Sequence, residues 1–139
     1  MTGKQNELRI EASVDKLPEV LDFVESHLSA ADCPFKTLMQ INIAVEEVFV
    51  NIASYAYAPN TGDAVIQGEI SSDPAAVRLT FIDRGIPYNP LEKKDPDVTL
   101  SAEERQIGGL GIFMTKKLMD KVDYAYRDGQ NILTLTKLL

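Results

Sequence analysis

The sequence predicts an α+β two-layer sandwich, in which helices pack on one face of a mixed, mainly antiparallel sheet. The first observation is the order of the expected elements: strand, helix, helix, strand, strand, a long polar segment, helix, strand and strand. The second is that short, turn-rich sequences, "SSDPA" and "RDGQ", join consecutive strands, which favours antiparallel hairpins. With 139 residues the chain is most simply one domain, residues 1–139.

The first half of the chain is expected to form one strand and two helices. "NELRIEAS" alternates apolar and polar residues, which is the period of a half-buried strand. "SVDKLPEVLDFVESHLSAAD" has apolar residues at helical spacing, with Ser13 or Asp15 as the N-cap and Pro18 in the first turn. The segment from Phe35 to Tyr57 contains no Gly or Pro and is almost unbroken in apolar residues, which predicts one long buried helix.

The second half is expected to form two hairpins, a lid and a helix. "AVIQGEISS" and "AVRLTFID" form the first hairpin, and "DYAYRDGQNILTLTK" forms the second. Between them, a polar and proline-containing segment with little periodicity predicts a lid at about residues 91–107. The helix that follows lies within "IGGLGIFMTKKLMDKVDY", and its candidate core positions are Ile112, Phe113, Leu118 and Met119.

Composition excludes several classes of function. The formal net charge is −7 and the basic residues are dispersed, so direct binding of nucleic acid is not expected. The sequence has neither a secretory signal nor an apolar run of membrane-spanning length, which predicts a cytoplasmic protein without a membrane partner. Cys33 and His27 are the only residues of their types, which excludes a disulfide framework, a Cys/His zinc site and a His-dependent triad. Any chemistry must therefore come from carboxylates, amides, hydroxyls and the backbone.

The first candidate motif interrupts the apolar face of the long helix. Glu47 and Asn51 in "AVEEVFVNIASYAY" are four residues apart, so they project from one side of the helix, one turn apart. They could be a solvated polar stripe. They could also form a site, because a carboxylate among apolar neighbours can act as a general base and an amide oxygen can bind Mg²⁺. Helical phase separates Glu46 from this face by roughly 100°.

The second candidate motif is "FIDRGIPYNP", at the end of a strand. An Asx-type turn leaving the sheet explains it structurally. Alternatively, Asp83 is an acceptor-only group suited to an exocyclic amine such as that of adenine, and Gly85 lets a flat ring approach the backbone.

The third candidate motif is "IGGLGI", which places glycines at the start of a helix. Tight packing of the helix on a strand would explain them. They would also suit a phosphate site, because the first turn of a helix has free N–H groups and the positive end of the helix dipole.

In their order and spacing, the three motifs resemble the N, G1 and G2 boxes of the GHKL (histidine-kinase-like) ATPase superfamily. The chain is similar in particular to the small bacterial anti-sigma factors that are also serine-protein kinases. "EEVFVNIASYAY", "DRGIPYNP" and "GGLGIFMTKKLMDKVDY" carry the resemblance, which extends from about residue 5 to the C-terminus. Two positions depart from the family pattern, since Tyr55 replaces a common His and Tyr88 replaces the usual Phe.

The resemblance implies a Bergerat fold that binds ATP and Mg²⁺ in a single GHKL ATPase-like domain. It implies that Glu47 is the catalytic base and that Asn51 holds Mg²⁺ against the ATP phosphates. Asp83 would accept a hydrogen bond from the adenine amine, and Arg105 in the ATP lid would meet the terminal phosphate. The remaining residues implied in nucleotide binding are Gly85, Pro87, Gly109, Leu110 and Gly111.

The resemblance also implies a function and its partners. The expected protein is an anti-sigma-type regulator that phosphorylates Ser or Thr of a small anti-anti-sigma (STAS-type) antagonist and sequesters a sigma factor by partner switching. A homodimer is expected on the same ground. The alternative is a catalytically inactive GHKL-fold module that acts only by binding proteins.

Overall fold

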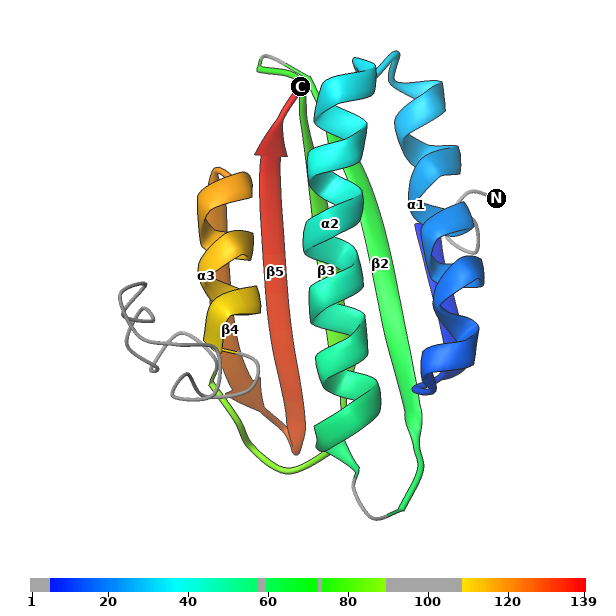
Figure 1. Cartoon of the computed structure of the whole chain (residues 1–139), viewed down its shortest axis with the longest axis vertical. Helices are drawn as coiled ribbons and strands as arrows, with labels where there is room; N and C mark the ends of the chain where they lie inside the picture. The colour runs from blue at the N-terminus through cyan, green and yellow to red at the C-terminus, as the bar shows by residue number, and fades with distance from the viewer. Residues whose placement is uncertain (1–5, 58–59, 73, 90–108) are drawn as a thin grey trace.

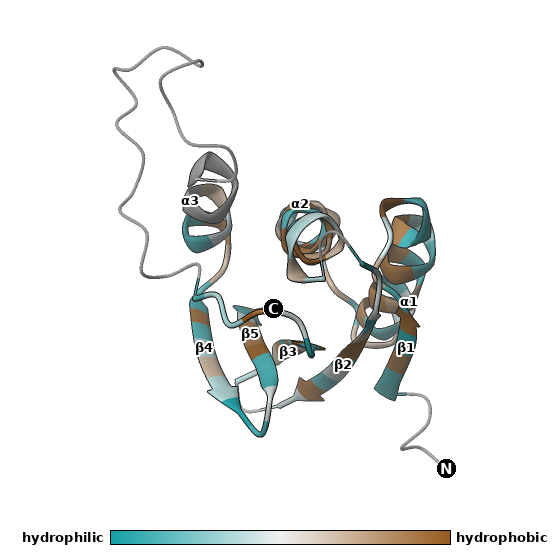
Figure 2. Cartoon of the chain, turned by 90° about the horizontal axis from the view of Figure 1, so that it is seen from below, coloured by the Kyte–Doolittle hydropathy of each residue, from teal (hydrophilic) through white to brown (hydrophobic). Residues whose placement is uncertain are grey.

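The computed structural model describes residues 6–57, 60–72, 74–89 and 109–139. The helices and strands appear in the predicted order (Figure 1): β1 (Glu7–Glu11), α1 (Leu17–Ala30), α2 (Phe35–Asn51), β2 (Asp63–Ser71), β3 (Ala76–Asp83), α3 (Gly109–Leu118), β4 (Lys121–Arg127) and β5 (Gln130–Leu138). Figure 2 shows the three helices on one face of the sheet. The predicted two-layer α+β sandwich is therefore confirmed.

The sheet has five strands in the order β1-β2-β3-β5-β4. All pairings between neighbouring strands in the described part of the chain are antiparallel. The two predicted hairpins form the pairs β2–β3 and β4–β5, while β3 and β5 pair across the segment that contains α3. Because β3 and β5 lie side by side in the middle of the sheet, residues distant in sequence meet at their ends.

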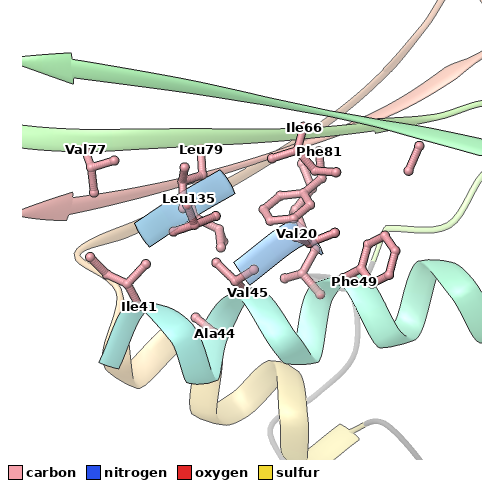
Figure 3. Packing of buried hydrophobic residues seen from close by; sticks show 14 of the residues in the cluster. Val20, Ile41, Ala44, Val45, Phe49, Ile66, Val77, Leu79, Phe81 and Leu135 are labelled. Atoms are coloured by element: carbon pink, nitrogen blue, oxygen red, sulfur yellow. The ribbon is translucent and has the colours of Figure 1, made fainter. Parts of the chain in front are cut away.

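The core lies between the inner face of the sheet and the three helices (Figure 3). Side chains from α1 and α2 meet those of β2, β3 and β5 in one continuous cluster. Its labelled members in Figure 3 are Val20, Ile41, Ala44, Val45, Phe49, Ile66, Val77, Leu79, Phe81 and Leu135. Of the four core positions predicted around α3, Met119 is buried and Leu118 is half-buried. The side chains of Ile112 and Phe113 lie outside the described part of the chain.

The start of α1 differs from the prediction. The chain enters α1 through a short 3-10 turn, Val14–Lys16, so the N-cap position falls on Lys16 and has no side-chain cap. The Ser13 hydroxyl instead donates a hydrogen bond to the Asp15 carboxylate. The expected cap at Ser13 or Asp15 is therefore wrong, whereas Pro18 lies in the first turn as predicted.

The end of α1 is closed by a left-handed residue. Asp32 has φ of 55°. The N–H of Cys33 donates to the carbonyl of Leu28 at 3.1 Å, and that of Asp32 to the carbonyl of Ser29 at 3.3 Å. These two bonds form a Schellman motif, in which the left-handed position favours glycine.

Replacing Asp32 with Gly is expected to raise the free energy of unfolding by about 0.5–1 kcal/mol. Glycine adopts the left-handed conformation without a steric cost, and the change removes a negative charge from the negative end of the helix dipole. The urea midpoint measures the effect, with Asp32→Asn as the control that removes only the charge. A lower midpoint for Asp32→Gly than for wild type would contradict this account of the turn.

Two further turns shape the site end of the molecule. The last turn of the predicted long helix is a π-helical turn, Ile52–Ala56, so regular α-helix ends at Asn51 rather than near Tyr57. The β4–β5 hairpin turns at Asp128 and Gly129, whose φ angles are 53° and 75°. Two successive positive φ values are the signature of a type I′ turn, and the hairpin turns at "RDGQ" as predicted.

Candidate active site

Four elements end together at one side of the fold. The end of α2, the end of β3, the beginning of β5 and the beginning of α3 lie toward the lower part of Figure 1. Each of the three sequence motifs occupies one of these ends. The topology therefore brings the motifs to the same end of the molecule, although long segments of the chain separate them.

The structure joins Glu47 and Asn51 directly. The Asn51 Nδ2 donates a hydrogen bond to the Glu47 Oε2 at 2.8 Å, and both residues are half-buried. Asn42 bonds to Glu25 of α1 and therefore marks the side of α2 that faces α1. Asn51 lies nine positions later, about two and a half helical turns, and so projects on the opposite side, toward α3. Glu46 is exposed.

Asp83 is a buried carboxylate at the end of β3, with 5% of its surface exposed. Its Oδ1 accepts hydrogen bonds from the Gly85 N–H and from the Asn131 Nδ2, both at 2.9 Å. The bond to Gly85 is an Asx turn, so the structural interpretation of this motif is realised. Within the described residues both bonds end on Oδ1, which leaves Oδ2 for a ligand donor.

Gly85 is required by the protein itself. A Cβ at this position would lie 2.1 Å from the carbonyl oxygen of Ala56, and the adjacent Ile86 N–H donates to that same oxygen at 2.9 Å. The turn after β3 is thus packed directly against the π-helical end of α2. The close approach that the glycine permits is to backbone of the chain, in addition to any approach to a ligand.

Asn131 is the central residue of this turn, and sequence reasoning missed it. It is 6% exposed and lies opposite Asp83 in the β3–β5 register. Its Nδ2 donates to the Asp83 Oδ1 and, at 2.8 Å, to the Ile86 carbonyl. Its Oδ1 accepts from the Tyr88 N–H at 3.1 Å and from the Tyr124 hydroxyl. One carboxamide therefore fixes both the Asp83 carboxylate and the turn that follows it.

The sequence does contain a signal for Asn131. The inner-face positions of β5 continue with Leu133 and Leu135, both buried in the core. Strand alternation places Asn131 on the same face, where a polar residue needs buried partners. A polar residue in phase with two core leucines is the pattern to look for.

Tyr57 ties the ends of α2, β2 and β3 together. Its hydroxyl donates to the Asp63 carbonyl at 2.6 Å and accepts from the Arg84 N–H at 2.7 Å. Burial raises the pKa of Tyr57, the nearby carboxylates of Asp83 and Asp63 raise it further, and the Arg84 hydrogen bond opposes the increase. The phenol is thus held in its neutral, donating form.

Replacing Tyr57 with Phe is expected to cost about 1–2 kcal/mol of stability, because two backbone groups lose a partner. The substitution should also remove the part of the pH dependence of stability that comes from titration of Tyr57. The pKa of Tyr57 is higher in the folded than in the unfolded chain, so its contribution is fully present below about pH 10 and is lost as pH rises through the folded value. Thermal unfolding above neutral pH measures both effects, with Tyr126→Phe, at an exposed position of β4, as the matched control. If the stability of the two variants changed equally with pH in the alkaline range, Tyr57 would not be the source of this pH dependence.

The remaining predicted residues are placed only in part. Pro87 is exposed in the turn that Asn131 holds, and Tyr55 is half-exposed in the π-helical turn after α2. Gly109, Leu110 and Gly111 form the first turn of α3. Arg105 and the predicted lid at about residues 91–107 lie outside the described residues.

Two side-chain oxygen atoms at this end of the fold have the chemistry that Mg²⁺ and the adenine of ATP require. Among the described residues, no group of three or more His, Cys, Asp or Glu side chains is arranged to hold a metal ion. The hydrogen bond from Asn51 to Glu47 uses the amide nitrogen and directs no donor to Asn51 Oδ1, which is the kind of neutral oxygen that Mg²⁺ accepts beside phosphate oxygens. The Asp83 Oδ2 is an acceptor suited to an adenine amine.

No helix in the described ranges is both long enough and apolar enough to cross a membrane.

Comparison with known proteins identifies the family. The profile of the histidine kinase-like ATPase domain matches residues 10–137. Serine/threonine-protein kinase BtrW of Bordetella bronchiseptica is 27% identical over 137 residues, which covers 98% of this chain and 95% of that protein. Serine-protein kinase RsbW of Listeria monocytogenes is 29% identical over 116 residues, which covers 80% of this chain and 72% of that protein.

Two solved structures share the fold. The crystal structure of the RsbU and RsbW domains of a Mycobacterium tuberculosis protein matches with a TM-score of 0.66 at 19% identity and covers 96% of this chain; the match spans 32% of that longer chain. The histidine kinase domain of a blue-light activated kinase from Erythrobacter litoralis matches with a TM-score of 0.55 at 19% identity, covering 88% of this chain and 61% of that chain. The predicted resemblance is therefore confirmed, and the chain belongs to the histidine kinase-like ATPase domain family.

Proposed function

We propose that this protein is an ATP-dependent kinase that phosphorylates a serine or threonine of a small antagonist protein. The observation that carries the proposal is the 2.8 Å hydrogen bond between Asn51 and Glu47 on the α3 side of α2. It holds the Glu47 carboxylate against the amide nitrogen of Asn51 and leaves the Asn51 Oδ1 outside this bond, at the end of the fold where Asp83 is buried. Similarity to proteins named serine-protein kinases supports the same activity.

In this proposal, one set of residues binds the nucleotide and Glu47 transfers the proton. Asp83 accepts the adenine amine on Oδ2, while Asn131 keeps its Oδ1 in place. The N-terminal turn of α3, with Gly109 and Gly111, offers backbone N–H groups to the phosphates. The role we propose for Arg105 is to contact the terminal phosphate. Asn51 Oδ1 would hold Mg²⁺, which would supply charge stabilisation for the phosphates.

Glu47 acts as the general base of the transfer. Its carboxylate takes the proton from the attacking hydroxyl, whose oxygen forms a bond to the γ-phosphorus. The bond between that phosphorus and the β–γ bridging oxygen breaks, and ADP leaves with the bridging oxygen. The products are ADP and the phosphorylated antagonist, and positioning supplies most of the catalysis.

The output we propose is partner switching. The kinase alternately binds a sigma factor and an anti-anti-sigma, STAS-type antagonist, and phosphorylation of the antagonist releases the kinase to sequester the sigma factor. A homodimer in the cytoplasm is the expected working form. The resemblance of the three motifs to small anti-sigma kinases supports this output.

The test is a transfer assay with γ-labelled ATP. The protein is incubated with a purified small STAS-type antagonist, and the label is expected on a single Ser or Thr of the antagonist. A version of the antagonist with that residue replaced by Ala is the control. If the protein binds both ATP and the antagonist but transfers no label, the kinase proposal is wrong and the chain acts as a binding module.

A further inference from the structure

The outward face of α2 carries a line of exposed apolar side chains that the fold does not use. Phe35, Met39 and Ile43 are 75%, 44% and 50% exposed. They occupy successive positions four residues apart, so they form one ridge about 12 Å long on the helix surface. We call Phe35, Met39 and Ile43 the α2 ridge. Single exposed apolar residues are ordinary, whereas an aligned row on a surface helix marks a contact surface.

The α2 ridge lies opposite the core. The residues of α2 that face the sheet are Ile41, Ala44, Val45, Val48 and Phe49, all of them buried. In Figure 1, α2 is the middle helix, with α1 on one side and α3 on the other, and its outer face points away from the sheet. No side chain of the ridge belongs to the core cluster, so stability does not explain the apolar residues.

Charges differ on the two sides of the α2 ridge. On the side of α1, Glu25 contacts Asn42 of α2, and Asp22 lies one turn before it. Glu46 on α2 and Asp32 before the helix are also exposed on this side. On the side of α3, helical phase places the exposed Lys36 of α2. The ridge is therefore bordered by four carboxylates on one side and by Lys36 on the other.

From this arrangement we propose that the α2 ridge is a docking surface for an amphipathic helix of a partner protein, with Lys or Arg along the flank that faces α1. An apolar ridge of about two helical turns matches the i, i+3, i+4 and i+7 anchors of a docked helix. The four carboxylates determine the charge of its flank and the direction in which it lies.

The ridge also leads to the candidate active site. Glu47 and Asn51 are the next two positions of the same four-residue series that contains Phe35, Met39 and Ile43. A helix docked on the ridge therefore ends beside Glu47. This surface goes beyond the proposed function, because helix binding can be measured without phosphoryl transfer.

Two designed peptides test the proposal. Both have about 18 residues, enough for a stable helix, and the same apolar face, but one has a Lys flank and the other a Glu flank. Fluorescence anisotropy measures their binding to the full chain. The Lys-flanked peptide is expected to bind at least about tenfold tighter, a preference that weakens at high salt. Equal binding of the two peptides, or binding of neither, would overturn the proposal.

Variants assign the binding to this face. Met39→Ser and Ile43→Ser should each weaken binding of the Lys-flanked peptide about tenfold, whereas Ile70→Ser, an exposed apolar residue on β2, should not. Asp22→Lys should reduce the preference for the Lys flank and leave the fold intact. If the ridge variants leave peptide binding unchanged, or if sedimentation shows that they instead dissociate a dimer of this chain, the proposed occupant is wrong.

Discussion

Replacing Glu47 with Gln is expected to lower the rate of phosphoryl transfer by about 10²–10⁴-fold, the usual contribution of a general base. Glutamine keeps the size of the side chain and an oxygen that can accept the hydrogen bond from Asn51. The variant should therefore fold and bind ATP nearly as wild type does. It cannot take the proton of the attacking hydroxyl, so the loss should appear in the rate constant of transfer rather than in affinity.

Single-turnover transfer of labelled phosphate and calorimetric titration of ATP separate the two quantities. Glu46→Gln is the matched control, because Glu46 is the adjacent residue and is exposed to solvent. At saturating antagonist, where a weaker docking contact does not limit transfer, its transfer rate constant should equal that of wild type. If Glu47→Gln transferred phosphate at the wild-type rate, Glu47 would not be the base. The hydrogen bond between Glu47 and Asn51 would then only stabilise the helix.

The elements that the sequence predicted well are those determined by local chemistry. The hairpin at Asp128 and Gly129 follows from two residues that tolerate positive φ, and α2 follows from a long apolar stretch without Gly or Pro. The cap of α1 was predicted wrongly because a 3-10 turn shifted the cap position to Lys16. Such shifts depend on how the incoming strand meets the helix, which short-range patterns do not contain.

The candidate site was predictable in its motifs but not in its connections. The spacing of Glu47 and Asn51 implied a shared helix face, and the structure joins them. The role of Asn131 depends on the pairing of β3 with β5, which places it opposite Asp83. That pairing is non-local, because β5 is inserted between β3 and β4 in the sheet. No local rule could therefore have connected the two residues.

Replacing Asn131 with Asp is expected to be the most damaging change at this end of the fold. The substitution keeps the shape but turns the donor toward Asp83 into a second carboxylate oxygen, and it removes the donor to the Ile86 carbonyl. An uncompensated charge at a buried position costs about 3–5 kcal/mol. The Asp83 carboxylate would also lose its fixed orientation, so ATP affinity at neutral pH should fall at least about tenfold.

The pH dependence separates this mechanism from a general packing defect. Two adjacent buried carboxyl groups favour binding of a proton, so the folded-state pKa of the pair in the variant lies above its unfolded value. The stability that this proton provides is present at low pH and is lost as pH rises through the folded pKa. Urea unfolding from pH 5 to pH 8 should therefore show the variant losing stability relative to wild type as pH rises.

Asn60→Asp, which changes an exposed asparagine in the α2–β2 connection, is the matched control and should stay within about 0.5 kcal/mol of wild type. A constant, pH-independent difference between Asn131→Asp and wild type would mean that the new carboxylate does not interact with Asp83, and Asn131 would then act only by filling space.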